Sequence, residues 1–394
     1  MQLFGRRYDT REPVCVHIGS DTISRIDSLD PGDHRVDDWP WIAPGLFDIQ
    51  ANGYGGQEFS SAELTPEKVV DVARQYLAFG VTRFCPTLTT ESFEVLEHGL
   101  AAIDEACRRF DDLAGRVAGV HLEGPYVTAE DGARGAHPRH HCHPPDWSEF
   151  QRLQSAAGGR IRIHTLSPEY DEAVEFIAKV AAAGVVVAIG HTAADSDQIR
   201  RAVEAGARLS THLGNGAHLF LPRHPNYLWD QLAEDRLVAS LIADGHHLPP
   251  EVVKTFIRAK TPPRCILVSD LSGMAGLAPG RYPSGLCELE ILDDGHIAVA
   301  GQRDILAGAS RPLGEGVANV IRFAGVDLAV AVAMATAHPA ELLGLSPDRL
   351  EPGATANLVQ FDLGDRAGEE RGAGFRVRAT VADGRLVWGT AWAP

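Results

Sequence analysis

The stretch VAGVHLEGPYV, from Val117 to Val127, has the pattern of a strand that enters the protein interior. Its apolar run ends at Glu123, and the Gly-Pro pair that follows stops the strand. A carboxylate at the end of a buried strand costs free energy unless it is paired or solvated. Glu123 is therefore either a solvated residue at the mouth of the strand or a residue that holds a cation.

This run is one of eight that alternate with helix-like segments along the chain. The eight runs are WIAPGLFDIQ, VTRFCPTLT, RVAGVHLE, RIRIHTLSP, VVVAIGHT, RLSTHLGN, LVASLIADGHH and CILVSD. Between several of them lie amphipathic stretches with helical spacing, such as TPEKVVDVARQYLAFG and DSDQIRRAVEAGA. Continuous apolar strands joined by helices indicate a parallel sheet with both faces covered. Eight such units predict an α/β fold, a (β/α)8 TIM-like barrel.

The two ends of the chain differ from this pattern. They contain short strand-like segments such as ATANLVQFDL and RATVADGRLVWG, with turn signals such as Asp383-Gly384 and no clear helix. We therefore expect a small β-sandwich formed by the N- and C-terminal segments, residues 1–42 and 352–394. The barrel domain is then expected to span residues 43–351.

Composition narrows the class of protein. The chain has 394 residues, 44% hydrophobic and 23% charged, which is ordinary for a soluble globular protein. Its net charge of −17 argues against a nucleic-acid partner, because such a surface needs clustered Lys and Arg. No segment approaches the ~20 apolar residues of a membrane span, and the N-terminus lacks the apolar core of a signal peptide. We expect a cytoplasmic protein with no nucleic-acid or membrane partner and with reduced cysteines.

Polar residues gather where the predicted strands end, and in a barrel of this kind the active site lies at those carboxyl ends. Taken singly, each has an ordinary explanation, since a histidine there is usually a hydrogen-bonded polar residue and Asp270 could cap a helix. Carboxylates and imidazoles from several strands together indicate a site for Zn²⁺ or a neighbouring first-row metal, with an aspartate that accepts a proton from water. The residues are Asp48, Gln50, Asn52, His121, Glu123, His191, His212, Asp244, His246, His247 and Asp270.

Six motifs follow one another in the order found in one known family: PGLFDIQANGYGG, HLEGPY, GHTAA, THLGN, IADGHH and SD…AGL. In these motifs the chain resembles the N-acetylglucosamine-6-phosphate deacetylases of the amidohydrolase superfamily. The resemblance runs from about residue 42 to LAGAS at 306–310, and continues into ATAHPAELLGL and EPGATANLVQFD.

The resemblance implies a role for each matching residue. Glu123, His191 and His212 match the family's metal ligands, and Asp270 matches its catalytic acid/base. His137, in RGAHP, matches the histidine that polarises the acetamide carbonyl. The implied activity is therefore hydrolysis of the N-acetyl group from an amino-sugar 6-phosphate.

The resemblance also implies a metal count and a substrate site. Gln50 and Asn52 stand beside the expected substrate, where many amidohydrolases have a His-x-His pair that binds a second metal. One divalent metal per chain is therefore expected, Zn²⁺ first, with Fe²⁺, Co²⁺ or Mn²⁺ as alternatives. In the family the arginine that matches Arg223 reaches in from the neighbouring subunit, which implies a homodimer with shared active sites. The residues that match the sugar-phosphate site are Asn215, Gly216, Arg223 and His247.

Departures from the family pattern leave the exact sugar open. Gly214, Gly216 and Ala217 replace an aromatic residue, Ala and Met, and Leu271 replaces the Ala that usually follows the catalytic Asp. One alternative is an amidohydrolase acting on another N-acyl sugar, amide or imide. A substrate without phosphate would need neither Arg223 nor His247. Another alternative is a catalytically inactive barrel that binds or assembles with a partner, although the retained ligand set and aspartate speak against it.

Overall fold

The computed structural model describes residues 1–30, 36–364 and 374–393, and its central element is a barrel of eight parallel strands. Their order is β14-β13-β12-β11-β10-β9-β8-β5. The sheet closes where the backbone N–H of Asp270 donates to the Gln50 carbonyl (2.9 Å) and that of Asn52 to the Leu271 carbonyl (2.9 Å). All eight predicted strands are confirmed. They are β5 (Leu46–Ala51), β8 (Val81–Thr89), β9 (Val120–Glu123), β10 (Ile161–Leu166), β11 (Val186–Ile189), β12 (Ala207–Ser210), β13 (Val238–Leu241) and β14 (Cys265–Leu267).

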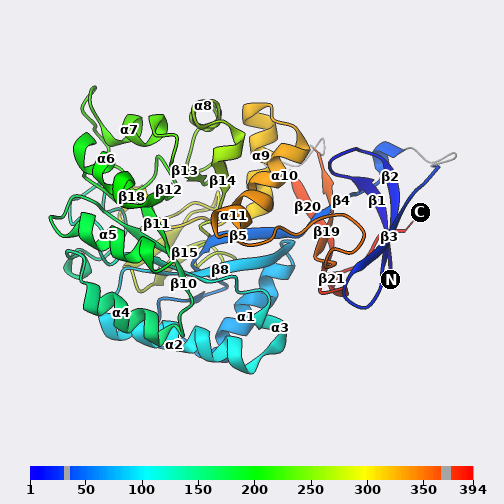
Figure 1. Cartoon of the computed structure of the whole chain (residues 1–394), viewed down its shortest axis with the longest axis horizontal. Helices are drawn as coiled ribbons and strands as arrows, with labels where there is room; N and C mark the ends of the chain where they lie inside the picture. The colour runs from blue at the N-terminus through cyan, green and yellow to red at the C-terminus, as the bar shows by residue number, and fades with distance from the viewer. Residues whose placement is uncertain (31–35, 365–373, 394) are drawn as a thin grey trace.

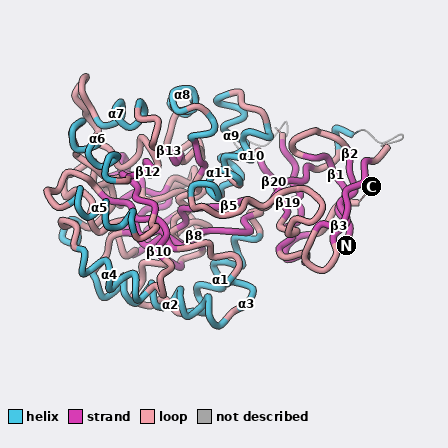
Figure 2. Tube along the Cα trace, in the orientation of Figure 1, coloured by secondary structure: helices cyan, strands magenta, loops and turns pink. Residues whose placement is uncertain are grey.

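Helices cover the outside of this barrel, as Figure 2 shows in cyan around the magenta strands. Local sequence sets their starts: Thr65 caps α1 through its side chain, and Asp195 and Gln198 form a capping box at α6. The helices are α1 (Pro66–Leu77), α2 (Phe93–Arg109), α3 (Asp111–Ala114), α4 (Trp147–Ala156), α5 (Ala173–Ala182), α6 (Ser196–Ala205), α7 (Tyr227–Ala233), α8 (Pro250–Lys260), α9 (Leu313–Ala324), α10 (Leu328–Met334) and α11 (Ala337–Leu342), with the 3₁₀ turns η1 (Val36–Asp38), η2 (Arg139–His141) and η3 (Pro262–Arg264).

The two chain ends meet in one seven-stranded sheet beside the barrel, where Figure 1 also places both termini. Its order is β21-β20-β19-β4-β1-β2-β3, and side chains such as Leu3, Ile23 and Val381 are buried in its core. The predicted β-structure from both termini is confirmed, and the division of the chain at residues 42 and 352 stays a prediction. The strands are β1 (Gln2–Arg7), β2 (Pro13–Ile18), β3 (Ile23–Ser28), β4 (Trp41–Pro44), β19 (Leu358–Leu363), β20 (Phe375–Ala382) and β21 (Arg385–Gly389).

A small antiparallel sheet between β14 and α9 was not expected from the sequence. Its strands are β15 (Gly280–Pro283), β16 (Glu288–Ile291), β17 (Ile297–Val299) and β18 (Gln302–Leu306). In β16, Leu289 and Ile291 are buried and alternate with the more accessible Glu288 and Glu290, which is the two-residue period of a strand. We call residues 280–306 the insert sheet. A short hairpin, β6 (Gly53–Tyr54) and β7 (Gln57–Glu58), follows β5.

The inside of the barrel is packed rather than open. Phe47, Ile49, Ile163, Leu209 and Ile266 belong to one buried apolar cluster inside the strands. This packing leaves the carboxyl ends of the strands as the place where polar groups can meet. None of the helices formed by the described residues is long and apolar enough to cross a membrane.

Candidate active site

The carboxyl ends of the barrel strands surround a cavity of about 290 Å³. Strand ends, the loops that follow them and the insert sheet all contribute to its walls. The structure therefore brings most of the predicted site residues into one place. Those that line the cavity are Asn52, Glu123, His137, His191, His212, Asn215, Gly216, His247 and Asp270.

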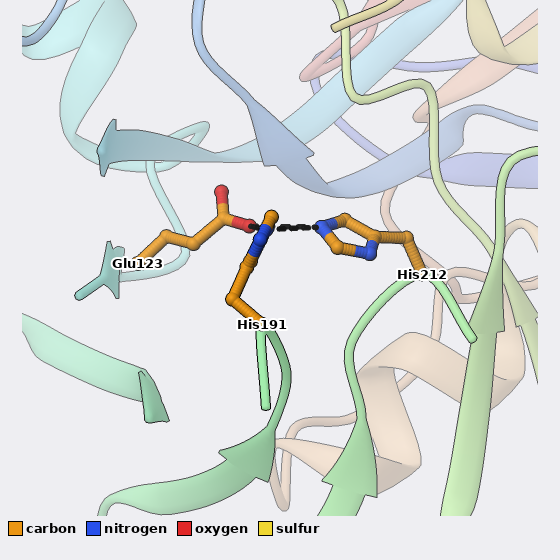
Figure 3. A group of neighbouring side chains, drawn as sticks. All are labelled: Glu123, His191 and His212. Carbon is orange, nitrogen blue, oxygen red and sulfur yellow. Dashed lines mark hydrogen bonds and ion pairs between the residues drawn. The ribbon is translucent and has the colours of Figure 1, made fainter. Parts of the chain in front are cut away.

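Glu123, His191 and His212 form a buried cluster on this cavity. Oε1 of Glu123 lies 3.1 Å from Nε2 of His191 and 2.9 Å from Nε2 of His212, and the two nitrogens are 3.1 Å apart. Figure 3 shows the three side chains converging from separate strand ends. Within the part of the chain that the structure describes, no other set of three His, Cys, Asp or Glu side chains brings its donor atoms within 4.8 Å of one another.

The hydrogen bonds of this cluster fit a divalent metal. Nδ1 of His191 donates to the Ala133 carbonyl at 3.2 Å, which leaves the lone pair of its Nε2 pointing at the cluster. Burial raises the pKa of Glu123, but the hydrogen bonds and charges of the two histidines outweigh it and lower the pKa well below its usual value. One carboxylate and two imidazoles that face one point are a donor set suited to Zn²⁺ and its neighbours.

Backbone strain marks the same place. His191, His212 and Asp270 have φ angles of 48°, 30° and 52°, in the left-handed region that residues other than glycine seldom adopt. Each such residue costs roughly 1–3 kcal/mol. Only three other non-glycine residues of the described chain have a positive φ, and they lie elsewhere. The fold therefore holds these three side chains at the cavity against their local preference.

Asp270 lies beside the cluster, and two residues at the carboxyl end of β5, Gln50 within it and Asn52 just after it, support both carboxylates. Nδ2 of Asn52 donates to Oδ1 of Asp270 at 2.8 Å, and Nε2 of Gln50 donates to Oε2 of Glu123 at 3.1 Å. Asp270 is 7% exposed, and its burial, together with the charge of Glu123, raises its pKa to about 6. A carboxyl group with that pKa can take up and return a proton close to neutral pH.

His137 reaches the cavity from the long loop after β9. Its Nδ1 is hydrogen-bonded to Oγ1 of Thr90 at 2.7 Å, which leaves Nε2 to meet a ligand. Its ring centre lies 4.2 Å from that of His191. Burial and the nearby charge of His191 lower the pKa of His137 well below its usual value.

The predicted sugar-phosphate residues divide into two groups. Asn215, Gly216 and His247 line the cavity. Gly216 has a φ of 56°, and a Cβ there would lie 2.6 Å from Nδ1 of His191, so only glycine lets the backbone approach this ring so closely. Arg223 is different: it is exposed on the loop between β12 and α7 and is not among the residues that line the cavity.

Several residues at the site were not assigned a role from the sequence. Thr90 supports His137, and nothing in its sequence context sets it apart from the neighbouring threonines. Asp244, which the sequence indicates only as one of the strand-end residues, accepts a hydrogen bond from Nδ1 of His247 at 2.8 Å. Asp304 and Leu306 of the insert sheet form part of the wall.

The comparisons with known proteins agree with this geometry. The family model described as Amidohydrolase family matches residues 41–387. An N-acetylglucosamine-6-phosphate deacetylase of Bos taurus is 36% identical, over 88% of this chain and 83% of that protein. An N-acetylgalactosamine-6-phosphate deacetylase of Escherichia coli O157:H7 is 30% identical, over 82% of this chain and 84% of that protein.

A solved structure of a deacetylase of this kind is also similar to the chain. A mutant N-acetyl-D-glucosamine-6-phosphate deacetylase from Mycobacterium smegmatis, in complex with N-acetyl-D-glucosamine-6-phosphate, superimposes with a TM-score of 0.85 at 28% identity. The match covers 98% of this chain and 99% of that chain. The chain therefore belongs to the N-acetylglucosamine-6-phosphate deacetylase family of the amidohydrolase superfamily.

Proposed function

We propose that the protein is a metal-dependent hydrolase that removes the acetyl group from N-acetylglucosamine 6-phosphate, releasing acetate and glucosamine 6-phosphate. The observation that carries this proposal is the meeting of Glu123, His191 and His212 with Asp270 in one cavity. Relatives named for this reaction, up to 36% identical to the chain, support the substrate class.

Glu123, His191 and His212 would hold one divalent metal, with Zn²⁺ the first choice for a carboxylate and two imidazoles. When bound, the metal acts as a Lewis acid that polarises a carbonyl and makes water a better nucleophile. Gln50 supports a count of one metal ion per chain. Its Nε2 already donates to Glu123, and neutral amides are poor zinc ligands beside imidazole and carboxylate.

Asp270 would move the proton that hydrolysis requires. As the water oxygen attacks the acetyl carbon, the Asp270 carboxylate accepts a proton from that water. When the C–N bond breaks, the same group returns the proton to the leaving nitrogen, so that acetate and an amine result. Asn52 holds Oδ1 of Asp270 through the 2.8 Å hydrogen bond, which leaves Oδ2 for this transfer.

His137 would stabilise the negative charge that develops on the carbonyl oxygen during the attack. When the Thr90 hydroxyl donates to Nδ1 of His137, across the 2.7 Å contact, the ring proton is on Nε2. A neutral imidazole then presents an N–H donor to the oxyanion from a site that is already buried. Removal of such a donor typically costs 10²- to 10³-fold in turnover.

A second copy of the chain would complete the phosphate site. No lysine or arginine occurs among the described residues that line the cavity, yet a phosphate dianion calls for cationic donors. Arg223 lies exposed on a loop beside Leu219 and Phe220, which are 68% and 92% exposed. Two apolar side chains so exposed next to this arginine support a homodimer in which Arg223 serves the neighbouring site. A phosphorylated sugar as substrate also fits a cytoplasmic location.

Acetate release from a panel of substrates tests the proposal. The panel is N-acetylglucosamine, N-acetylgalactosamine and N-acetylmannosamine, each with and without the 6-phosphate. We expect the highest kcat/KM for N-acetylglucosamine 6-phosphate. Equal use of phosphorylated and free sugars would favour an amidohydrolase for another N-acyl substrate, and a preference for the galacto sugar phosphate would move the assignment to the activity for which the Escherichia coli relative is named.

A further inference from the structure

The loop after β13 ties an aspartate to a histidine that lines the cavity. Oδ2 of Asp244 accepts a hydrogen bond from Nδ1 of His247 at 2.8 Å. Oδ1 of the same carboxylate accepts the backbone N–H groups of His246 and His247, at 2.8 and 2.9 Å. Both oxygens therefore accept hydrogen bonds, and the loop is wrapped around the carboxylate.

This pair is shielded from solvent, and a hydrogen bond from a neighbouring helix fixes the loop that carries it. The side chains of His247 and Asp244 are 6% and 5% exposed. Asn319 of α9 donates to the Ala243 carbonyl at 2.8 Å, which fixes the start of the loop. Burial raises the pKa of Asp244, but the hydrogen bonds and charge of His247 and the two backbone N–H groups lower it to about 2. The hydrogen bonds that Asp244 accepts therefore favour its carboxylate form.

A carboxylate against Nδ1 decides how His247 meets a ligand. Because Oδ2 of Asp244 can only accept, the proton of a neutral His247 ring is on Nδ1, and Nε2 then carries a lone pair. The ring can donate from Nε2 only as an imidazolium. That cation is compensated by Asp244 and is further favoured by an anion in the cavity, so the contact selects for a negatively charged ligand group.

We propose that Asp244 is a positioning residue that acts through His247: it fixes the ring and its tautomer so that Nε2 binds the anionic 6-phosphate as a charged donor. The inference rests on the phosphorylated substrate proposed above and adds to it the residue that makes the His247 contact selective for an anion. The neighbouring His246 has a different role, since its ring contacts His296 of the insert sheet and Arg311.

Asp244→Asn is the direct test. The new side-chain oxygen can keep both backbone hydrogen bonds, while its NH₂ group faces Nδ1 of His247 and moves the ring proton to Nε2. A neutral donor replaces a charged one, and charge-assisted hydrogen bonds are roughly twice as strong as neutral ones. KM for N-acetylglucosamine 6-phosphate should rise on the order of tenfold, with kcat changed less than about threefold. KM for free N-acetylglucosamine should stay within about twofold.

A double-mutant cycle distinguishes this role from a purely structural one. In a His247→Gln background the ring is gone, so adding Asp244→Asn should leave the ratio of the two KM values unchanged. Asp294→Asn is the matched control, because Asp294 also accepts from a histidine Nδ1, that of His296 at 2.9 Å, outside the cavity. It should behave as wild type. A further tenfold rise in the double variant, or equal losses on both sugars, would overturn the proposal.

The wild-type protein offers a readout that does not depend on a variant folding. In ¹⁵N NMR of protein labelled at the histidine rings, with the His247 signal assigned through His247→Gln, we expect the Nδ1–H tautomer in the free protein. Addition of glucosamine 6-phosphate should protonate Nε2, whereas free glucosamine should not. An Nε2–H tautomer in the free protein would refute the role of Asp244. Wild-type protein that releases no acetate would instead refute the proposed function. The ring tautomer measured in the free protein would still test whether Asp244 holds the proton on Nδ1 of His247.

Discussion

Replacing Asp270 with asparagine separates proton transfer from the other roles of this side chain. The amide has nearly the same shape as the carboxyl group, and its oxygen can still accept the 2.8 Å hydrogen bond from Asn52. The substitution leaves Glu123, His191 and His212 in place. The amide cannot take up a proton near neutral pH, so Asp270→Asn should keep its metal and its substrate affinity and lose turnover.

The size of the loss follows from the burial of the site. A positioned general acid/base contributes on the order of 10²- to 10⁴-fold, or about 3–5 kcal/mol of activation free energy. Asp270 is 7% exposed, so bulk water has poor access to replace it as proton acceptor. We therefore expect kcat to fall by roughly 10³- to 10⁴-fold, the upper half of that range.

The same residue sets the acid side of the pH profile. Burial and the charge of Glu123 raise the pKa of Asp270 to about 6, and a cation held by the cluster would favour the ionised form and lower it. The ionised form is the base, so kcat/KM of the wild type should rise with pH up to an inflection at or below about 6 and then level off. Asp270→Asn should lack this inflection.

Acetate release from N-acetylglucosamine 6-phosphate measures the loss, and elemental analysis of the same samples measures the bound metal. Asp293→Asn is a suitable control, since Asp293 is an exposed aspartate on the turn after β16 and should leave both quantities unchanged. Turnover of Asp270→Asn within tenfold of wild type would show that another group moves the proton. Loss of metal together with turnover would show that Asp270 serves as a ligand instead.

Three further perturbations test the rest of the site and the fold. Arg223→Ala should lower kcat/KM for the 6-phosphate sugar far more than for the free sugar, and equal losses on both sugars would show that Arg223 does not bind the phosphate. Mixing Arg223→Ala chains with Asp270→Asn chains should restore some activity, because one site of each mixed dimer would have both residues intact. Glu123→Gln should purify with less than a tenth of the wild-type metal by elemental analysis. Lys260 is buried and donates to the Gln231 and Glu234 carbonyls, and its pKa is lowered by burial to about 8. The unfolded chain therefore keeps this proton to a higher pH than the folded chain does. Between pH 7 and 10, the free energy of unfolding of the wild type, measured in urea, should rise by roughly 2–3 kcal/mol relative to that of Lys260→Met.

The barrel could be predicted because each strand is an apolar run that ends in a polar residue. Glu123 illustrates the reason: in a parallel sheet the period of the side chains and the common direction of the strands place such ends together. The cluster with His191 and His212 follows from that rule, and the resemblance to a known family supplied the roles. Asp270 was recognised as a strand-end carboxylate in the same way.

The insert sheet and the supporting contacts could not be predicted in this way. The insert has short strands and a turn at Asp293-Asp294-Gly295, so its alternation extends over only a few residues. Thr90 acts on His137 across 47 positions of sequence, and such a contact exists only once the barrel has closed. In the proposed homodimer, the position of Arg223 relative to a cavity would depend on a second chain, which is a property of an assembly rather than of one sequence.

The measurement that tests the central claim most directly is a metal titration of the chelated protein, followed by acetate release from N-acetylglucosamine 6-phosphate. We predict that activity rises linearly with added Zn²⁺ and levels off at one ion per chain, because Glu123, His191 and His212 form one site. Folded protein that binds zinc and releases no acetate at any ratio would contradict the account. So would an activity that levels off only at two ions per chain.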